Sequence, residues 1–173
     1  MIMFFNRFVL ALFLYFIIHF NASHKVGSSL SAEEVTLPLP RFVSLRNDQV
    51  RLRTGPGVQY PIEWIYQRRH LPVEIIAEYR TWRKIRDWQS TQGWVHQGML
   101  SGNRTVIVTG KRRSLRSNAD AKSTPVAEIE VDAIADLEKC PSGSGWCLVE
   151  AGEISGWLRK VEFWGAYKDE VIQ

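Results

Sequence analysis

Cysteine is scarce in this chain, with two residues among 173. Two cysteines are too few for a disulfide-built scaffold or for a zinc site with four cysteine ligands. Enzyme signatures are also missing: the sequence contains no P-loop, no dinucleotide fingerprint, no His-Glu-x-x-His motif and no Gly-x-Ser-x-Gly elbow. We therefore expect a protein that is not an enzyme and that has no metal site and no cofactor.

A strong excess of one charge is missing too, since the net charge at pH 7 is +4. A balance this mild does not by itself indicate a nucleic-acid partner, and we expect none. Hydrophobic residues make up 45% of the chain and charged residues 23%. That ordinary globular composition excludes global disorder and a multi-span membrane protein.

One apolar run stands out, the thirteen residues 8–20. It is shorter than the roughly 20 residues that span a bilayer, and it fits the apolar part of a secretory signal. We expect residues 1–31 to be a signal peptide cut after Ser31. The alternative is that this segment is not cleaved and anchors the protein. In that case we expect it to be the only part of the chain that contacts a membrane. Residues 32–41 form a linker, and export predicts a periplasmic or otherwise secreted protein in an oxidising compartment.

An internal repeat organises the rest of the chain. Four landmarks recur in the same order, 63 or 64 residues apart: Leu52-Arg53 as Leu115-Arg116, Pro61 as Pro125, Trp82 as Trp146, and Gly93-Trp94-Val95 as Gly156-Trp157-Leu158. Matching order and near-constant spacing indicate a duplication.

Each copy has room for five or six short strands. Residues 50–53 alternate apolar and polar side chains, residues 72–78 do so imperfectly, and turn-forming residues 54–57 lie between them. No window shows a long amphipathic helical stripe. Short strands at regular spacing predict small all-β barrels, one over residues 42–109 and one over residues 110–168, with a tail at 169–173.

The first copy resembles the bacterial SH3-like domain family. The resemblance rests on the run VRLRTGPG at residues 50–57, on Tyr60-Pro61, on Trp82 and on Gly93-Trp94-Val95. The second copy is divergent, because residues 117–120 replace the Gly-Pro-Gly turn. The whole chain resembles exported tandem SH3-like proteins of the Gram-negative envelope. That resemblance implies an all-β fold of two tandem small SH3-like β-barrels after an N-terminal signal segment, and a non-catalytic binding function.

The tryptophans that recur in both copies are expected to be structural. Trp82, Trp94, Trp146 and Trp157 occupy matched places, which predicts barrel core or packing between barrels rather than ligand contacts. Gly55 and Gly57 are expected to supply positive φ angles in the long first loop.

Aromatic residues without a counterpart in the second copy are the candidates for a binding site. In the SH3-like family the ligand groove lies between the first loop and a later loop, which implies Tyr60, Trp64 and Arg68 or Arg69 here. Trp88 lies in a polar turn and is a further candidate for exposure. Trp64 could equally be a core residue, because the sequence does not say which face of its strand points inward.

Cations concentrate in the first copy, which carries a net charge of +6 over residues 41–110 against −2 over residues 111–173. Arginine binds carboxylates through its planar fork, and peptidoglycan stem peptides are rich in carboxylates. The leading hypothesis is therefore recognition of peptidoglycan stem peptides by the first copy. The alternatives are an adaptor that binds an extended peptide of an envelope protein, and a structural protein without a ligand.

The two cysteines, Cys140 and Cys147, flank a loop rich in proline, glycine and serine. Two strands leaving one hairpin would bring them to bridging distance, so an oxidising compartment predicts a disulfide. A catalytic thiol would need a histidine partner, and the histidines beyond the signal segment lie outside the second copy.

Overall fold

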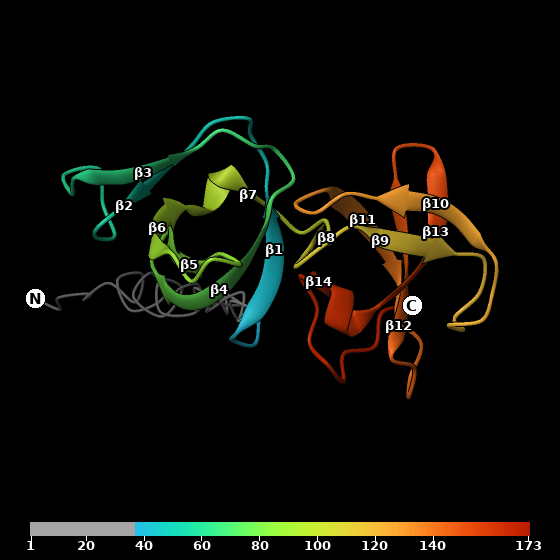
Figure 1. Cartoon of the computed structure of the whole chain (residues 1–173). Helices are drawn as coiled ribbons and strands as arrows, with labels where there is room; N and C mark the ends of the chain where they lie inside the picture. Colours follow the sequence, from blue (N-terminus) through green and yellow to red (C-terminus); the bar gives the residue numbers. More distant parts are fainter. Residues whose placement is uncertain (1–36) are drawn as a thin grey trace, which may run out of the picture. The chain divides into compact units, whose positions relative to one another are not determined.

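The computed structural model describes residues 37–173, which belong to one compact unit built from two antiparallel sheets (Figure 1). The predicted signal segment and most of the linker lie outside the described residues. The helices of the described part are two short 3-10 turns, Gln97–Met99 (η1) and Lys160–Glu162 (η2). No helix within residues 37–173 is long and apolar enough to cross a membrane.

The first sheet has seven strands in the order β3-β2-β6-β5-β4-β1-β7. Its strands are β1 (Arg41–Leu45), β2 (Val50–Arg53), β3 (Ile62–Tyr66), β4 (Pro72–Tyr79), β5 (Trp82–Arg86), β6 (Gln92–His96) and β7 (Leu100–Ser101).

The second sheet repeats this order strand for strand, as β10-β9-β13-β12-β11-β8-β14. Its strands are β8 (Thr105–Val108), β9 (Arg113–Arg116), β10 (Pro125–Ile129), β11 (Ile134–Lys139), β12 (Trp146–Ala151), β13 (Ile154–Arg159) and β14 (Phe163–Trp164). The fold is thus two tandem SH3-like β domains, as predicted. The sheets are not closed barrels, however, because each ends in two edge strands that do not pair with one another.

The repeated dipeptides occupy equivalent places in the two domains. Leu52 and Leu115 are buried in their respective cores. The following arginines lie opposite a tryptophan of the neighbouring strand, Arg53 opposite Trp94 and Arg116 opposite Trp157.

The glycine before each of these tryptophans allows two strands to approach closely. A Cβ atom on Gly93 would lie 2.5 Å from Leu52 Cγ and 2.9 Å from the Arg53 carbonyl oxygen. A Cβ atom on Gly156 would lie 2.7 Å from Leu115 Cβ. A larger residue would push β6 or β13 away from its neighbour, which explains the repeat of Gly-Trp.

Both cores are mainly aliphatic, and this corrects the expectation for the repeated tryptophans. The first is built around residues such as Leu45, Leu52 and Ile85, and the second around residues such as Val106 and Leu158. The four repeated tryptophans are only half-buried. Because they project from the outer faces of the strands, they remain available for contacts other than core packing.

The domain boundary lies earlier than predicted. Residues 105–108, expected to close the first domain, form β8, which pairs with β11 and β14 of the second sheet. The break therefore falls near residues 102–104. A short run of apolar residues has the same local pattern in either sheet, so only its pairing partners decide where it belongs.

The expected tail is part of the second domain. Ile172 and Cys140 exchange two backbone hydrogen bonds of 2.9 and 3.1 Å, and the Ile172 side chain packs against the second core. Cys140 and Cys147 form the predicted disulfide, and both are fully buried in that core.

Side chains of β1 pack against the C-terminal segment. The Phe42 ring lies edge-on to Trp164 at 4.8 Å between centroids and contacts Tyr167 at 4.7 Å. The Tyr167 hydroxyl donates a 2.8 Å hydrogen bond to Glu74 Oε1. Burial, and then this bond to the Glu74 carboxylate, raise the pKa of Tyr167 well above its usual value. The two sheets are thus joined by specific contacts within one compact unit.

Candidate functional site

The long loop between β2 and β3, residues 54–61, forms one wall of the candidate site. Arg53 stabilises this loop through two hydrogen bonds: its Nη1 donates to the carbonyl oxygens of Val58 at 3.0 Å and Tyr60 at 2.7 Å. The loop closes with a hydrogen bond from Thr54 N to the Pro61 carbonyl oxygen, at 3.1 Å. Because one guanidinium fixes two carbonyl groups, the loop has a defined shape without a ligand.

The glycines of this loop allow neighbouring side chains to pack closely, and they do not adopt backbone angles that only glycine favours. Neither Gly55 nor Gly57 is among the residues with positive φ, so that expectation was wrong. A Cβ atom on Gly55 would lie only 2.4 Å from the Tyr60 ring. Gly55 therefore makes room for the Tyr60 ring to lie against the loop.

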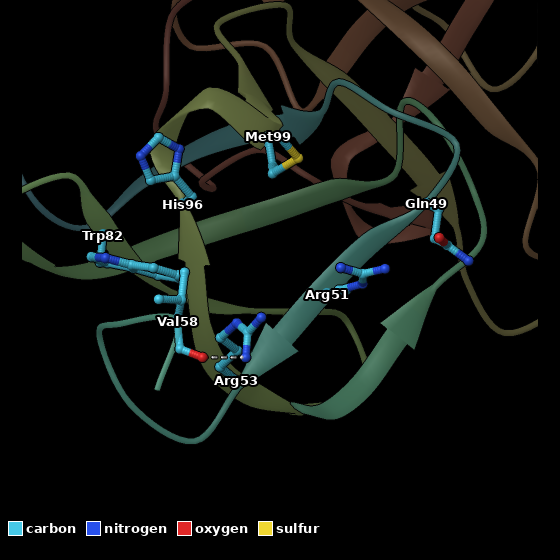
Figure 2. A pocket seen from close by; sticks show the side chains of 7 residues that line it. All are labelled: Gln49, Arg51, Arg53, Val58, Trp82, His96 and Met99. Atoms are coloured by element: carbon cyan, nitrogen blue, oxygen red, sulfur yellow. Dashed lines mark hydrogen bonds between the residues drawn. The ribbon is translucent and has the colours of Figure 1, made fainter. Parts of the chain in front are cut away.

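Between this loop and strands β5 and β6 lies an open groove, seen in Figure 2. One part has a volume of about 320 Å³, and an adjoining part of about 710 Å³ shares Val58, Trp82 and His96 with it. We call the two parts together the Trp82 groove. Its further lining residues include Gln49, Arg51, Met99, Tyr60, Tyr79 and Arg80.

Trp82 and His96 form the aromatic floor of the groove. They face each other across the β5–β6 ladder, with ring centroids 5.7 Å apart and planes at 86°. His96 Nδ1 accepts a hydrogen bond from Gly98 N at 3.1 Å. In the neutral imidazole the proton is then on Nε2, which leaves a donor beside the indole.

Arginine side chains border this floor. Arg51 is exposed on the outer face of β2, and among residues 37–173 no hydrogen bond or ion pair holds its guanidinium. Arg80 lies over the Tyr79 ring, with 5.5 Å from its Cζ to the ring centroid. The groove thus offers aromatic faces next to planar cations, a combination suited to a ligand with both apolar and carboxylate groups.

The β5–β6 turn that supports the floor is held by a buried polar cluster. Asp87 accepts hydrogen bonds from Tyr66 Oη at 3.0 Å, Gln89 N at 2.9 Å and Thr91 N at 2.8 Å. Burial, together with the charge and hydrogen bond of Asp87, raises the pKa of Tyr66 far above its usual value. Tyr66 therefore stays protonated and keeps donating to Asp87.

The structure places the predicted ligand residues in different regions. Tyr60 lines the Trp82 groove. Trp64 is 55% exposed on β3 and is not among the lining residues. Trp88 is half-buried and packs against the first core. Arg68 and Arg69 border a separate hollow of about 270 Å³, together with acidic residues of the second domain, Asp136 and Glu150.

Sequence reasoning missed Trp82, His96, Tyr79 and Arg51 as lining residues. Because Trp82 recurs as Trp146, the sequence predicts core packing for both. Recurrence is equally the sign of a shared surface site, and Trp146 lines the corresponding hollow of the second domain.

Comparison with known proteins gives one family match. The family described as "Bacterial SH3 domain" matches residues 46–102. No curated protein matches the chain. Among solved structures, NlpC1 and NlpC2 from Trichomonas vaginalis are each 9% identical, with a TM-score of 0.34. These matches cover 76% of this chain and 48% and 50% of theirs, so the chain spans about half the length of each.

The family match covers the first sheet except β1 (Arg41–Leu45), and it covers the whole site. It ends at residue 102, where the first sheet ends, and it contains every residue that lines the Trp82 groove. Residues 46–102 of this chain belong to the bacterial SH3 domain family.

Proposed function

We propose that this chain is an exported, non-catalytic binding protein whose first domain recognises peptidoglycan stem peptides in the Trp82 groove. The observation that carries the proposal is the meeting of aromatic faces and arginines in one open groove of the bacterial SH3 domain. Bacterial SH3 domains often bind peptidoglycan, which supports the same class of ligand.

The chemistry of the groove suits such a ligand. Stem peptides combine small alkyl side chains with free carboxylates. Trp82 and Tyr60 offer flat surfaces for alkyl groups, and Arg51 offers a guanidinium for a carboxylate. Arg53 already donates to the loop carbonyls, so we assign it the role of holding the loop rather than the ligand.

Export is supported by two independent features. The apolar run at residues 8–20 has the length of a secretory signal. The Cys140–Cys147 disulfide belongs to an oxidising compartment such as the periplasm. Because both cysteines are bonded to each other, neither is available as a nucleophile.

A second candidate function is an adaptor that binds an extended peptide of another envelope protein. Tyr60, Tyr79 and Trp82 together make the groove rich in aromatic residues, and grooves of that kind bind extended, proline-rich segments. Arg68 and Arg69, which would have favoured stem peptides had they flanked these aromatics, lie elsewhere.

The test is a pull-down of the full chain on purified peptidoglycan sacculi at low and near-physiological salt. The groove variant is Arg51→Gln/Arg80→Gln. The matched control is Arg68→Gln/Arg69→Gln, which removes the same charge from the separate hollow. We expect retention at both salt concentrations, a loss of about tenfold in the groove variant, and no change in the control.

Loss in the Arg68/Arg69 variant alone would move the site to the other hollow and contradict the proposed groove. Retention abolished by salt in all variants would mean diffuse charge attraction. No retention at either salt would place the adaptor function first, and Trp82→Ala would then be assayed with a proline-rich peptide.

A further inference from the structure

The second domain has a hollow of about 260 Å³ at the place equivalent to the Trp82 groove. Each of the seven residues that line the smaller part of that groove has its counterpart, 63 or 64 residues later, in this second hollow. Trp146 replaces Trp82, Arg116 replaces Arg53, and Arg159 replaces His96. We call it the Trp146 hollow.

The loop beside it keeps its shape although its glycines are gone. Arg116 Nη1 donates to the Ser123 carbonyl oxygen at 2.6 Å, as Arg53 does to that of Tyr60. Ser117 N donates to the Thr124 carbonyl oxygen at 2.9 Å, as Thr54 N does to that of Pro61. The frame of the site is therefore retained in the divergent copy.

Inside that frame Arg112 and Arg159 replace Gln49 and His96, whereas Ser114 replaces Arg51 and Glu162 replaces Met99, so the seven matched positions carry a charge of +2 in both domains. The second hollow differs because Lys111 and Arg113 also line it. Lys111, Arg112, Arg113, Arg116 and Arg159 line the hollow, and Glu162 is the one acidic residue among its lining. Residues 111–173 carry nine Lys or Arg and eleven Asp or Glu. Five of the nine cations thus gather in one hollow of a domain whose own net charge is negative.

These cations are anchored but keep donors to spare. Arg159 donates to Glu162 Oε1 at 2.7 Å and lies over the Trp146 ring, with 6.0 Å to its centroid. Arg113 Nη2 donates to the Thr109 carbonyl oxygen at 3.2 Å. Arg112 pairs with Glu130 at 2.6 Å on the exposed rim. Arg159 Nε donates to the same Glu162 oxygen at 3.1 Å. The side chains of Arg112 and Arg159 are 62% and 49% exposed, and these contacts use only one or two of the five N–H donors of each guanidinium.

The charge balance indicates the chemistry of that ligand. Glu128 also lies at the rim, where it accepts a 2.6 Å hydrogen bond from Ser114. After Glu162, Glu130 and Glu128 are set against the five cations, a net charge of +2 remains at the hollow. A single carboxylate would neutralise about one of these charges. A phosphate group carries about −1.5 to −2 at pH 7 and offers three acceptor oxygens to forked donors.

We propose that the second domain binds a phosphate group in the Trp146 hollow. This site goes beyond the function proposed for the first domain and does not depend on it. The same group could come from a phosphorylated soluble molecule or from a phospholipid headgroup, and the experiment separates the two sources.

The first arm titrates inorganic phosphate into the full chain and follows the Trp146 indole N–H by NMR, with acetate at equal ionic strength as the reference anion. The variant is Lys111→Gln/Arg112→Gln, two exposed side chains on the rim. The matched control, Lys139→Gln/Lys168→Gln, removes the same charge from exposed positions that do not line the hollow. We expect a saturable shift with phosphate, weakened about tenfold or more in the variant and unchanged in the control.

The second arm sediments the chain with phosphatidylcholine vesicles that do or do not contain phosphatidylglycerol. Retention by phosphatidylglycerol at near-physiological salt, lost in the rim variant alone, would identify a headgroup as the source. Phosphate binding with equal retention on both vesicles would identify a soluble phosphate.

Two results would overturn the proposal. One is a phosphate response no different from that of acetate. The other is an equal loss of binding in rim variant and control, which would reduce the effect to diffuse attraction. Neither result bears on the sacculus assay, because that assay varies residues of the first domain.

Discussion

Removal of the Cys140–Cys147 disulfide should unfold the second domain first. The bond joins residues seven apart in sequence, and on the chain-entropy estimate so short a ring stabilises by about 2.5 kcal/mol. Both cysteines are fully buried, so alanine would also leave small voids that cost about 1 kcal/mol. We expect Cys140→Ala/Cys147→Ala to lose about 3–4 kcal/mol, comparable to the whole stability of a domain of about 60 residues.

Differential scanning calorimetry, with and without a thiol reductant, measures this loss. At about 4–8 °C per kcal/mol for a domain this small, the second domain should melt about 15 °C or more below its normal temperature. The reduced wild-type chain keeps both sulfur atoms, so it should lose only the contribution of the ring, about 2.5 kcal/mol, and melt about 10 °C or more below the oxidised chain. Ser142→Ala, which changes an exposed residue of the same loop and keeps the ring, should melt as the wild type does. A drop of less than about 5 °C would refute the reasoning.

Three further predictions follow from buried contacts. Gly93→Ala should destabilise by about 1–3 kcal/mol in urea unfolding, because its Cβ would overlap Leu52, whereas Gly102→Ala, with no atom within 4 Å, should be neutral. Tyr66→Phe should cost about 1.5–3 kcal/mol by removing a donor from the buried Asp87 carboxylate, and an unchanged urea midpoint would contradict that role. Burial alone would raise the pKa of Glu170, but hydrogen bonds from Arg104 and Tyr167 N and the charges of Arg104 and Lys160 lower it below its ordinary 4.5. Since its folded pKa is depressed, the stability it contributes is present above about pH 4.5 and lost as the pH falls further, so Glu170→Gln should differ from wild type at neutral pH and converge with it in acid.

The two domains show how one frame can carry two chemistries. The arginine after the repeated leucine holds the loop in both copies, and a tryptophan recurs beside it. Around these constant parts, His96 and Met99 of the first groove become Arg159 and Glu162 in the second. The first copy carries the higher net charge, as expected. The Trp146 hollow of the second copy is nevertheless lined by more cationic side chains than the Trp82 groove.

The sequence by itself determined the all-β class, the duplication and the cysteine pair. These are local properties. Alternating side chains and turn residues specify short strands, a fixed spacing of Leu-Arg and Gly-Trp reveals the repeat, and a proline- and glycine-rich loop brings Cys140 close to Cys147. Leu-Arg and Gly-Trp recur together because the buried leucine of one strand packs directly against the glycine of the neighbouring strand, where a Cβ atom would not fit.

Only the tertiary structure decided which side chains meet in a groove. Trp64 and Tyr66 share one face of β3, yet Tyr66 is buried while Trp64 is 55% exposed where the strand leaves the core. Arg68 and Arg69 follow β3 closely in sequence but border the second domain, whereas Arg51, Trp82 and His96 converge from three strands. Strand pairing brings distant residues together, and a strand's own pattern does not contain its partners. The assignment of β8 to the second sheet has the same cause.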